Sequence, residues 1–119
     1  MIHESQVPDL LGKQIPAINP ELEKLAGLGN VYKTVQCFAD FTRNLAGAGN
    51  LPAVKSCIGI AEEMLEKGNN TVKNAIENVF LYTLSPILDM GDEIGIKLKA
   101  MMKGALLKEY NRQTNHGGI

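Results

Sequence analysis

The chain has 119 residues, a net charge of −1 and an apolar fraction of 45%. This length fits one domain with its own core, and the near-zero charge provides no general field to attract nucleic acid or an acidic membrane. Aromatic residues make up only 5% of the chain, and tryptophan is absent. The core must therefore consist mainly of aliphatic side chains, which favours packed helices over a β-sandwich.

The N-terminal part predicts two short helices. The first begins near Val7 and carries Pro8 in its first turn, where the missing N–H has no partner to lose. The second begins with Asn19 as its cap and Pro20 as its first residue, and it ends in the glycine-rich stretch 27–29. The apolar residues of the first helix share one face: Val7, Leu10, Leu11 and Ile15.

Two longer helices are predicted over residues 31–45 and 52–67, with the connector GAGN between them. The first has an apolar stripe of Val31, Val35, Phe38, Phe41 and Leu45. The second has a buried face of Val54, Cys57, Ile58, Ala61, Met64 and Leu65, and a face toward water of Glu62, Glu63, Glu66 and Lys67. Gly68 is a natural end for this helix.

The stretch 67–81 (KGNNTVKNAIENVFL) contains four asparagines before an apolar run. We interpret them as parts of a helix start rather than as a ligand site. Asn69 occupies the turn, Asn70 caps the helix, and Asn74 and Asn78 lie on its solvated face. The following run VFLYTL (79–84) is apolar nearly all round the helical wheel, which predicts a central helix enclosed by its neighbours.

The last helix is predicted to begin at Asp92 and to run to about Tyr110, after Ser85-Pro86 has ended or kinked the central one. One stripe should face the core: Ile94, Leu98, Met101, Met102 and Ala105. A second stripe lies roughly opposite: Ile96, Ala100, Lys103, Leu107 and Tyr110. Either this helix is sandwiched inside the domain or its second stripe meets another chain, and we favour a partner, with a homodimer as first candidate.

The pattern as a whole predicts an all-α protein, with a single domain of about five to six antiparallel-packed helices over residues 1–113 and a disordered tail over 114–119. Residues 1–4 lack a signal-peptide pattern, and no apolar run approaches a membrane span of about 20 residues. We therefore expect a cytoplasmic protein.

No catalytic, cofactor or metal constellation is expected. The histidines, His3 and His116, lie near the two ends, and Cys37 and Cys57 lie on or beside apolar helical faces as small hydrophobes. The carboxylate pairs, such as Glu62 with Glu66, lack the Glu-x-x-His spacing of helical di-metal sites. Nucleic-acid binding would require the lysines of the last helix, which point to several sides without interleaved aromatic residues.

The segment 68–84, GNNTVKNAIENVFLYTL, resembles a recurrent piece of small bacterial all-helical proteins of an uncharacterised family. It is also similar to the second helix of an armadillo- or HEAT-type helix pair, although no second copy occurs at a repeat period. The resemblance implies a helical fold and no catalytic residues. It also implies an interaction module, in some cases an immunity protein that neutralises a toxin.

Two functions therefore compete. The first is a non-catalytic protein-interaction module that works through the second stripe of the last helix. The alternative is a small enzyme or ligand carrier, with a pocket between helices near Tyr82, Asn78 or Cys57.

Overall fold

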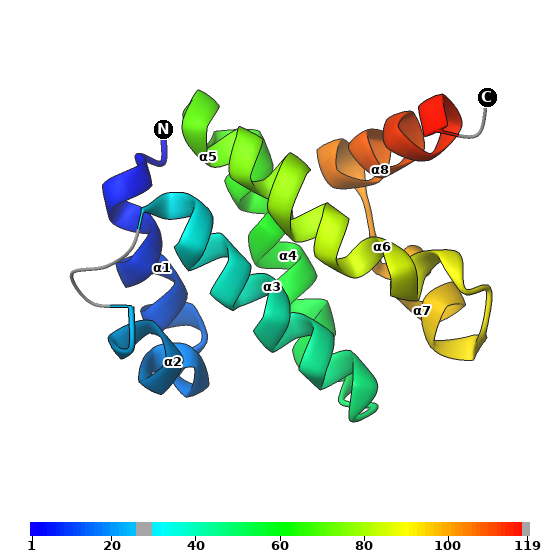
Figure 1. Ribbon diagram of the computed structural model, residues 1–119, viewed down its shortest axis with the longest axis horizontal. Helices are drawn as coiled ribbons and strands as arrows, with labels where there is room; N and C mark the ends of the chain where they lie inside the picture. Colours follow the sequence, from blue (N-terminus) through cyan, green and yellow to red (C-terminus); the bar gives the residue numbers. More distant parts are fainter. Residues whose placement is uncertain (26–29, 118–119) are drawn as a thin grey trace.

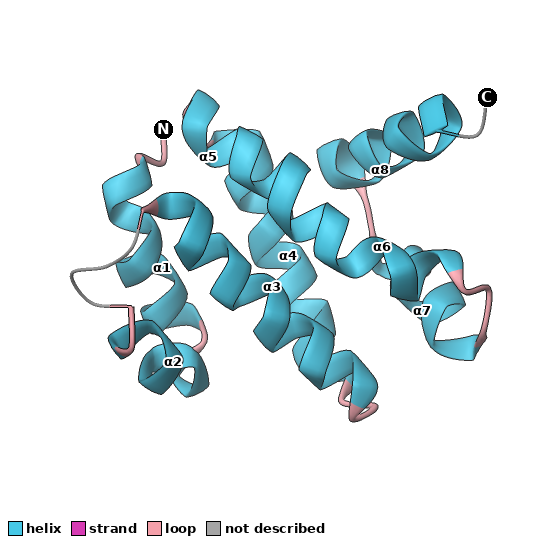
Figure 2. Ribbon diagram, viewed as in Figure 1, coloured by secondary structure: helices cyan, strands magenta, loops and turns pink. Residues whose placement is uncertain are grey.

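The computed structural model describes residues 1–25 and 30–117, and this part of the chain is built from helices (Figures 1 and 2). The α-helices are α1 (Val7–Gln14), α2 (Asn19–Glu23), α3 (Val31–Gly47), α4 (Leu51–Lys67), α5 (Asn70–Ala75), α6 (Leu81–Asp89), α7 (Glu93–Met101) and α8 (Gly104–Gly117). Short 3-10 helices cover Glu4–Gln6 and Pro16–Ile18, and a π-helical turn, η3, covers Ile76–Phe80. Extended pairing in the described ranges is limited to an isolated bridge between Ile2 and Gly68. The all-α, single-domain prediction is confirmed.

Three long rods form the centre of the domain: α3, α4, and a continuous helix made of α5, η3 and α6 (Figure 1). Consecutive rods run antiparallel, as the short connections predict. The short helices α1 and α2 cover α3 at one end of the molecule, whereas α7 and α8 pack on α4 at the other end.

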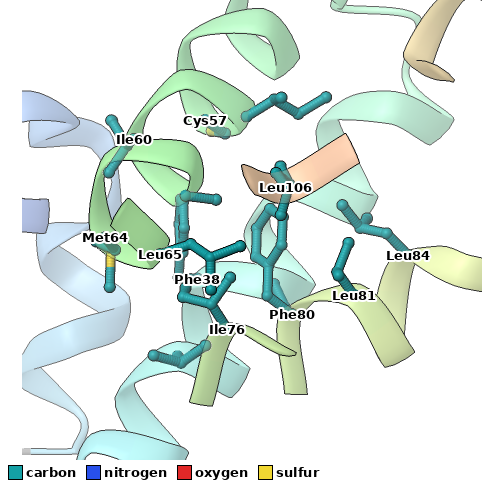
Figure 3. Packing of buried hydrophobic residues seen from close by; sticks show 14 of the residues in the cluster. Phe38, Cys57, Ile60, Met64, Leu65, Ile76, Phe80, Leu81, Leu84 and Leu106 are labelled. Carbon is teal, nitrogen blue, oxygen red and sulfur yellow. The ribbon is translucent and has the colours of Figure 1, made fainter. Parts of the chain in front are cut away.

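The core lies where these three rods meet (Figure 3). Phe38 of α3 and Phe80 stack with ring centroids 4.9 Å apart, and aliphatic side chains surround them. The predicted buried face of α4 is confirmed at all six positions: Val54, Cys57, Ile58, Ala61, Met64 and Leu65. On α3, Val31, Val35 and Phe38 are buried as predicted, while Phe41 and Leu45 are half-buried.

The central helix is not enclosed on all sides, in contrast to the prediction. The π-turn η3 inserts an extra residue into the helical ladder, which rotates the following residues around the helix axis. Phe80, Leu81 and Leu84 thereby join the buried face that starts at Val72 and Ile76. One edge of the helix stays open to water: Asn74, Asn78, Tyr82, Pro86 and Met90 are all exposed.

Two of the predicted helix caps differ in the structure. Asn69, rather than Asn70, caps α5, because its side chain accepts a hydrogen bond from the Val72 N–H at 3.0 Å. Asn19 does not cap α2; its side-chain amide instead donates to the carbonyl oxygen of Gly12 at 3.2 Å. The predicted end of this second helix, in the stretch 27–29, lies outside the described residues.

The C-terminal region departs most from the prediction. Ser85-Pro86 was expected to end or kink the central helix; the helix does not end there but continues through Pro86 to Asp89. The last helix begins at Asp92 as predicted, with the Asp92 side chain accepting from the Gly95 N–H at 2.8 Å, but it ends at Met101, and α8 starts anew at Gly104. The backbone of α8 is helical to Gly117, in contrast to the disordered tail predicted from residue 114 onward. Residues 118–119 lie outside the described ranges.

Candidate partner surface

The predicted partner stripe is divided between two helices. Ile96, with 60% of its surface exposed, and Ala100 lie on the outer face of α7, and the exposed Lys103 lies in the link to α8. This part of the stripe is open to solvent as predicted.

The α8 part of the stripe faces inward. Leu107 is half-buried, and Tyr110 belongs to the core with 5% of its surface exposed. The Tyr110 hydroxyl donates a hydrogen bond to Asp89 at the end of α6, and burial together with this bond raises the pKa of the phenol. The prediction that Tyr110 belongs to an exposed partner surface is therefore wrong, because the chain turns between α7 and α8.

The turn is held by a contact that is remote in sequence. Gly104 has a φ of +52°, a left-handed conformation that glycine adopts without strain. Directly after it, the N–H groups of Ala105 and Leu106 donate to the two carboxylate oxygens of Glu62, each at 2.8 Å. Glu62 is thus the cap of α8 and not simply part of a solvated face, as the sequence suggested.

Glu66 lies one turn further along α4, beside this cap. The hydrogen bond that it shares with Glu62, and the repulsion between the two carboxylates, raise the pKa of Glu66. Glu62 therefore serves the backbone of α8, and Glu66 is the carboxylate beside it.

The open edge of the central helix changes character along its length. Its first half presents the amides Asn74 and Asn78, whereas its second half presents Tyr82 (76% exposed), Pro86 and Met90 (69% exposed). The sequence contained a signal for this edge, since these residues follow one another at intervals of four. Tyr82 was nevertheless assigned to an enclosed helix, and Met90 was assigned to no surface.

The outer face of α7 follows after a short turn. Its exposed residues, with those directly before and after the helix, are Asp92, Glu93, Ile96, Lys97, Lys99, Ala100 and Lys103. The inner face carries Gly95, where an added Cβ would approach the carbonyl oxygen of Ile87 to 2.6 Å, so α7 lies very close to the backbone of α6. Lys99 places its ammonium group 5.8 Å from the ring centroid of Tyr110. We call Tyr82, Pro86, Met90, Ile96 and Ala100 together the α6–α7 surface.

The residues considered for a ligand pocket do not converge. Cys57 is buried in the core, whereas Asn78 and Tyr82 lie on the open edge of the central helix. Burial raises the pKa of the Cys57 thiol, and burial with the nearby Glu21 raises that of the half-buried Cys37, which lowers the thiolate fraction of both. His3 caps the first helical turn by accepting from the Ser5 N–H.

The described ranges offer neither a cluster of metal ligands nor a helix that could span a membrane. Within residues 1–25 and 30–117, no group of three or more His, Cys, Asp and Glu side chains is placed to hold a metal ion. The helices of these ranges are too short or too polar to cross a bilayer. Grooves are present, among them one of about 1050 Å³ between the N-terminal segment and the end of α4, lined by Asp9, Lys13, Glu66, Lys67 and other residues of both charges.

The fold and this surface define an all-α domain with a helical hairpin that exposes three large apolar side chains, Tyr82, Met90 and Ile96. The family described as a domain of unknown function (DUF7674) matches residues 8–117, and the chain belongs to this family. The predicted membership of an uncharacterised family is thereby confirmed. No curated protein and no solved structure matches the chain.

Proposed function

We propose that this protein is a non-catalytic protein-interaction module whose contact site is the α6–α7 surface. One observation carries the proposal. Five large apolar side chains are strongly exposed in the described residues, and three of them, Tyr82, Met90 and Ile96, lie on this one hairpin. The other two are Met1, at the chain end, and Tyr32, which is 40% exposed.

The chemistry of the surface suits a protein partner. Tyrosine and methionine are enriched in protein interfaces, and complete burial of one such apolar side chain contributes roughly 1.5–3 kcal/mol. A net charge of −1 and mixed charges around the hairpin favour a protein over nucleic acid. Both cysteines are free thiols, which fits the reducing environment of the cytoplasm. Immunity proteins act by binding of this kind, so a toxin is one partner class that the experiment below would reveal.

Co-purification from the host organism tests the proposal. Tagged protein is produced beside an untagged copy, and the proteins that it retains are compared between the wild type and a Tyr82→Glu/Ile96→Glu variant. Asn74→Glu is the matched control, because Asn74 lies on the polar half of the same exposed edge. We expect the wild type and the control to retain at least one protein, either a host protein or the untagged copy. The double variant should lose it. Retention of the same proteins by all three would refute the assignment of this surface.

A further inference from the structure

We propose that the outer face of α7 binds a second copy of this chain, with the two α7 helices antiparallel about a two-fold axis at Ile96. This inference rests on the proposed function and names the partner. It starts from the position of Ile96, which is 60% exposed near the middle of a helix of nine residues whose buried residues are Gly95 and Leu98. An isoleucine there contributes nothing to the core.

The charges of this face have opposite signs on either side of Ile96. Asp92 and Glu93 precede it by four and three residues, and Lys99 follows it by three; all three are exposed. A two-fold axis at Ile96 brings each residue before it level with the residue equally far after it on the other copy. The acidic end of one helix therefore lies level with Lys99 and Ala100 of its partner, and this happens twice in the dimer.

A parallel pair would bring like charges level with each other, and a partner carrying a single sign of charge would repel one end of the helix. Acidic residues at a helix start and basic residues at its end also suit the helix dipole, so the charges alone have a local explanation. The dipole, however, gives no reason for an exposed isoleucine between them. An antiparallel pair accounts for both features, because Ile96 meets Ile96 of the partner at the axis and opposite charges meet on either side.

The groups needed for these contacts are placed at the surface. Asp92 uses one carboxylate oxygen to cap its own helix at the Gly95 N–H, and its second oxygen can accept from Lys99 of the partner copy. Glu93 forms an exposed ion pair with Lys97 of its own helix at 2.9 Å. Lys99 stands over the Tyr110 ring, and its ammonium carries three donors. Because α7 has only nine residues, the contact area is small and the dimer should be weak.

Sedimentation equilibrium of the purified full chain at low salt tests the inference. We expect a concentration-dependent dimer for the wild type and a monomer for Ile96→Glu. Lys99→Glu should raise the dissociation constant about tenfold, since it creates like-charge contacts on both sides of the axis. Lys55→Glu, the same charge change at an exposed position of α4, is the matched control and should leave the dissociation constant unchanged.

Circular dichroism of each variant verifies that the helices are intact. A wild type that remains monomeric over the whole concentration range overturns the inference, as does a dimer that survives Ile96→Glu. The antiparallel register is overturned if Lys99→Glu acts no more strongly than Lys55→Glu. A monomer that still retains another host protein through Tyr82 and Ile96 would overturn the inference alone and leave the proposed function standing.

Discussion

Removal of the Glu62 side chain should loosen α8 without unfolding the three central rods. In the structure, both carboxylate oxygens of Glu62 accept backbone N–H groups, from Ala105 and Leu106, at 2.8 Å. These are two of the donors that a helix start leaves without an intrahelical partner. Helix caps of this kind contribute about 1–2 kcal/mol, and the relief of repulsion with Glu66 offsets part of the loss. We therefore expect Glu62→Ala to lower the free energy of unfolding by about 1 kcal/mol.

The assay is urea denaturation followed by circular dichroism, together with hydrogen exchange of the α8 amides. Glu63→Ala is the matched control, because Glu63 is the adjacent glutamate of α4 and forms only a distant ion pair with Lys67, at 3.9 Å. Its loss should change stability by less than about 0.5 kcal/mol and leave exchange in α8 unaltered. Equal effects of the two substitutions, or unchanged protection of α8 in Glu62→Ala, would refute the role of Glu62 as a cap.

Three further predictions test the core, the turn and the response to acid. Phe80→Ala should cost about 3–5 kcal/mol in urea denaturation through lost burial and a cavity, whereas Asn74→Ala should change stability by less than about 0.5 kcal/mol; similar values would mean that the faces are assigned wrongly. Gly104→Ala should destabilise by about 1–2 kcal/mol, because its φ is +52° and an added Cβ would clash with a carboxylate of α4; a neutral effect would argue against this turn geometry. Hydrogen bonding to Arg112 lowers the pKa of Glu109 below its unfolded value, so its stabilising contribution is present at neutral pH and is lost as the pH falls through the folded pKa. Glu109→Gln should therefore flatten the loss of stability on acidification, as measured by thermal melts between pH 6 and pH 3, and an unchanged slope would contradict the shift.

The helices and most of the core followed from local periodicity. On α4, the apolar residues repeat at helical spacing, and every residue assigned to the buried face lies in the core. The N-terminal helix likewise buries Val7 and Leu11, with Pro8 in its first turn. These features depend only on neighbours in sequence, which is why a pattern of residues was enough to predict them.

The wrong predictions concern features that depend on distant contacts or on small changes of helical register. The break before α8 depends on Glu62, which is 43 residues away from Ala105, and Gly104 alone did not distinguish a turn from a helix interior. The π-turn at Ile76–Phe80 rotates Tyr82 away from the core, and a regular helical wheel cannot represent such an insertion. Ile96 and Ala100 were assigned to the surface correctly. For the two reasons above, Tyr110 was placed on the surface wrongly, and the exposure of Tyr82 and Met90 was not predicted.

Site-specific photo-crosslinking in the host organism tests the interface most directly. A photoreactive amino acid replaces Ile96 in one variant and the control residue Asn74 in another, and the adducts are identified by mass spectrometry. We predict a protein adduct at position 96 and none at position 74, and the proposed dimer predicts that this adduct is a second copy of the chain. The absence of any protein adduct at position 96, or equal adducts at both positions, would contradict the claim that the α6–α7 surface is a protein interface.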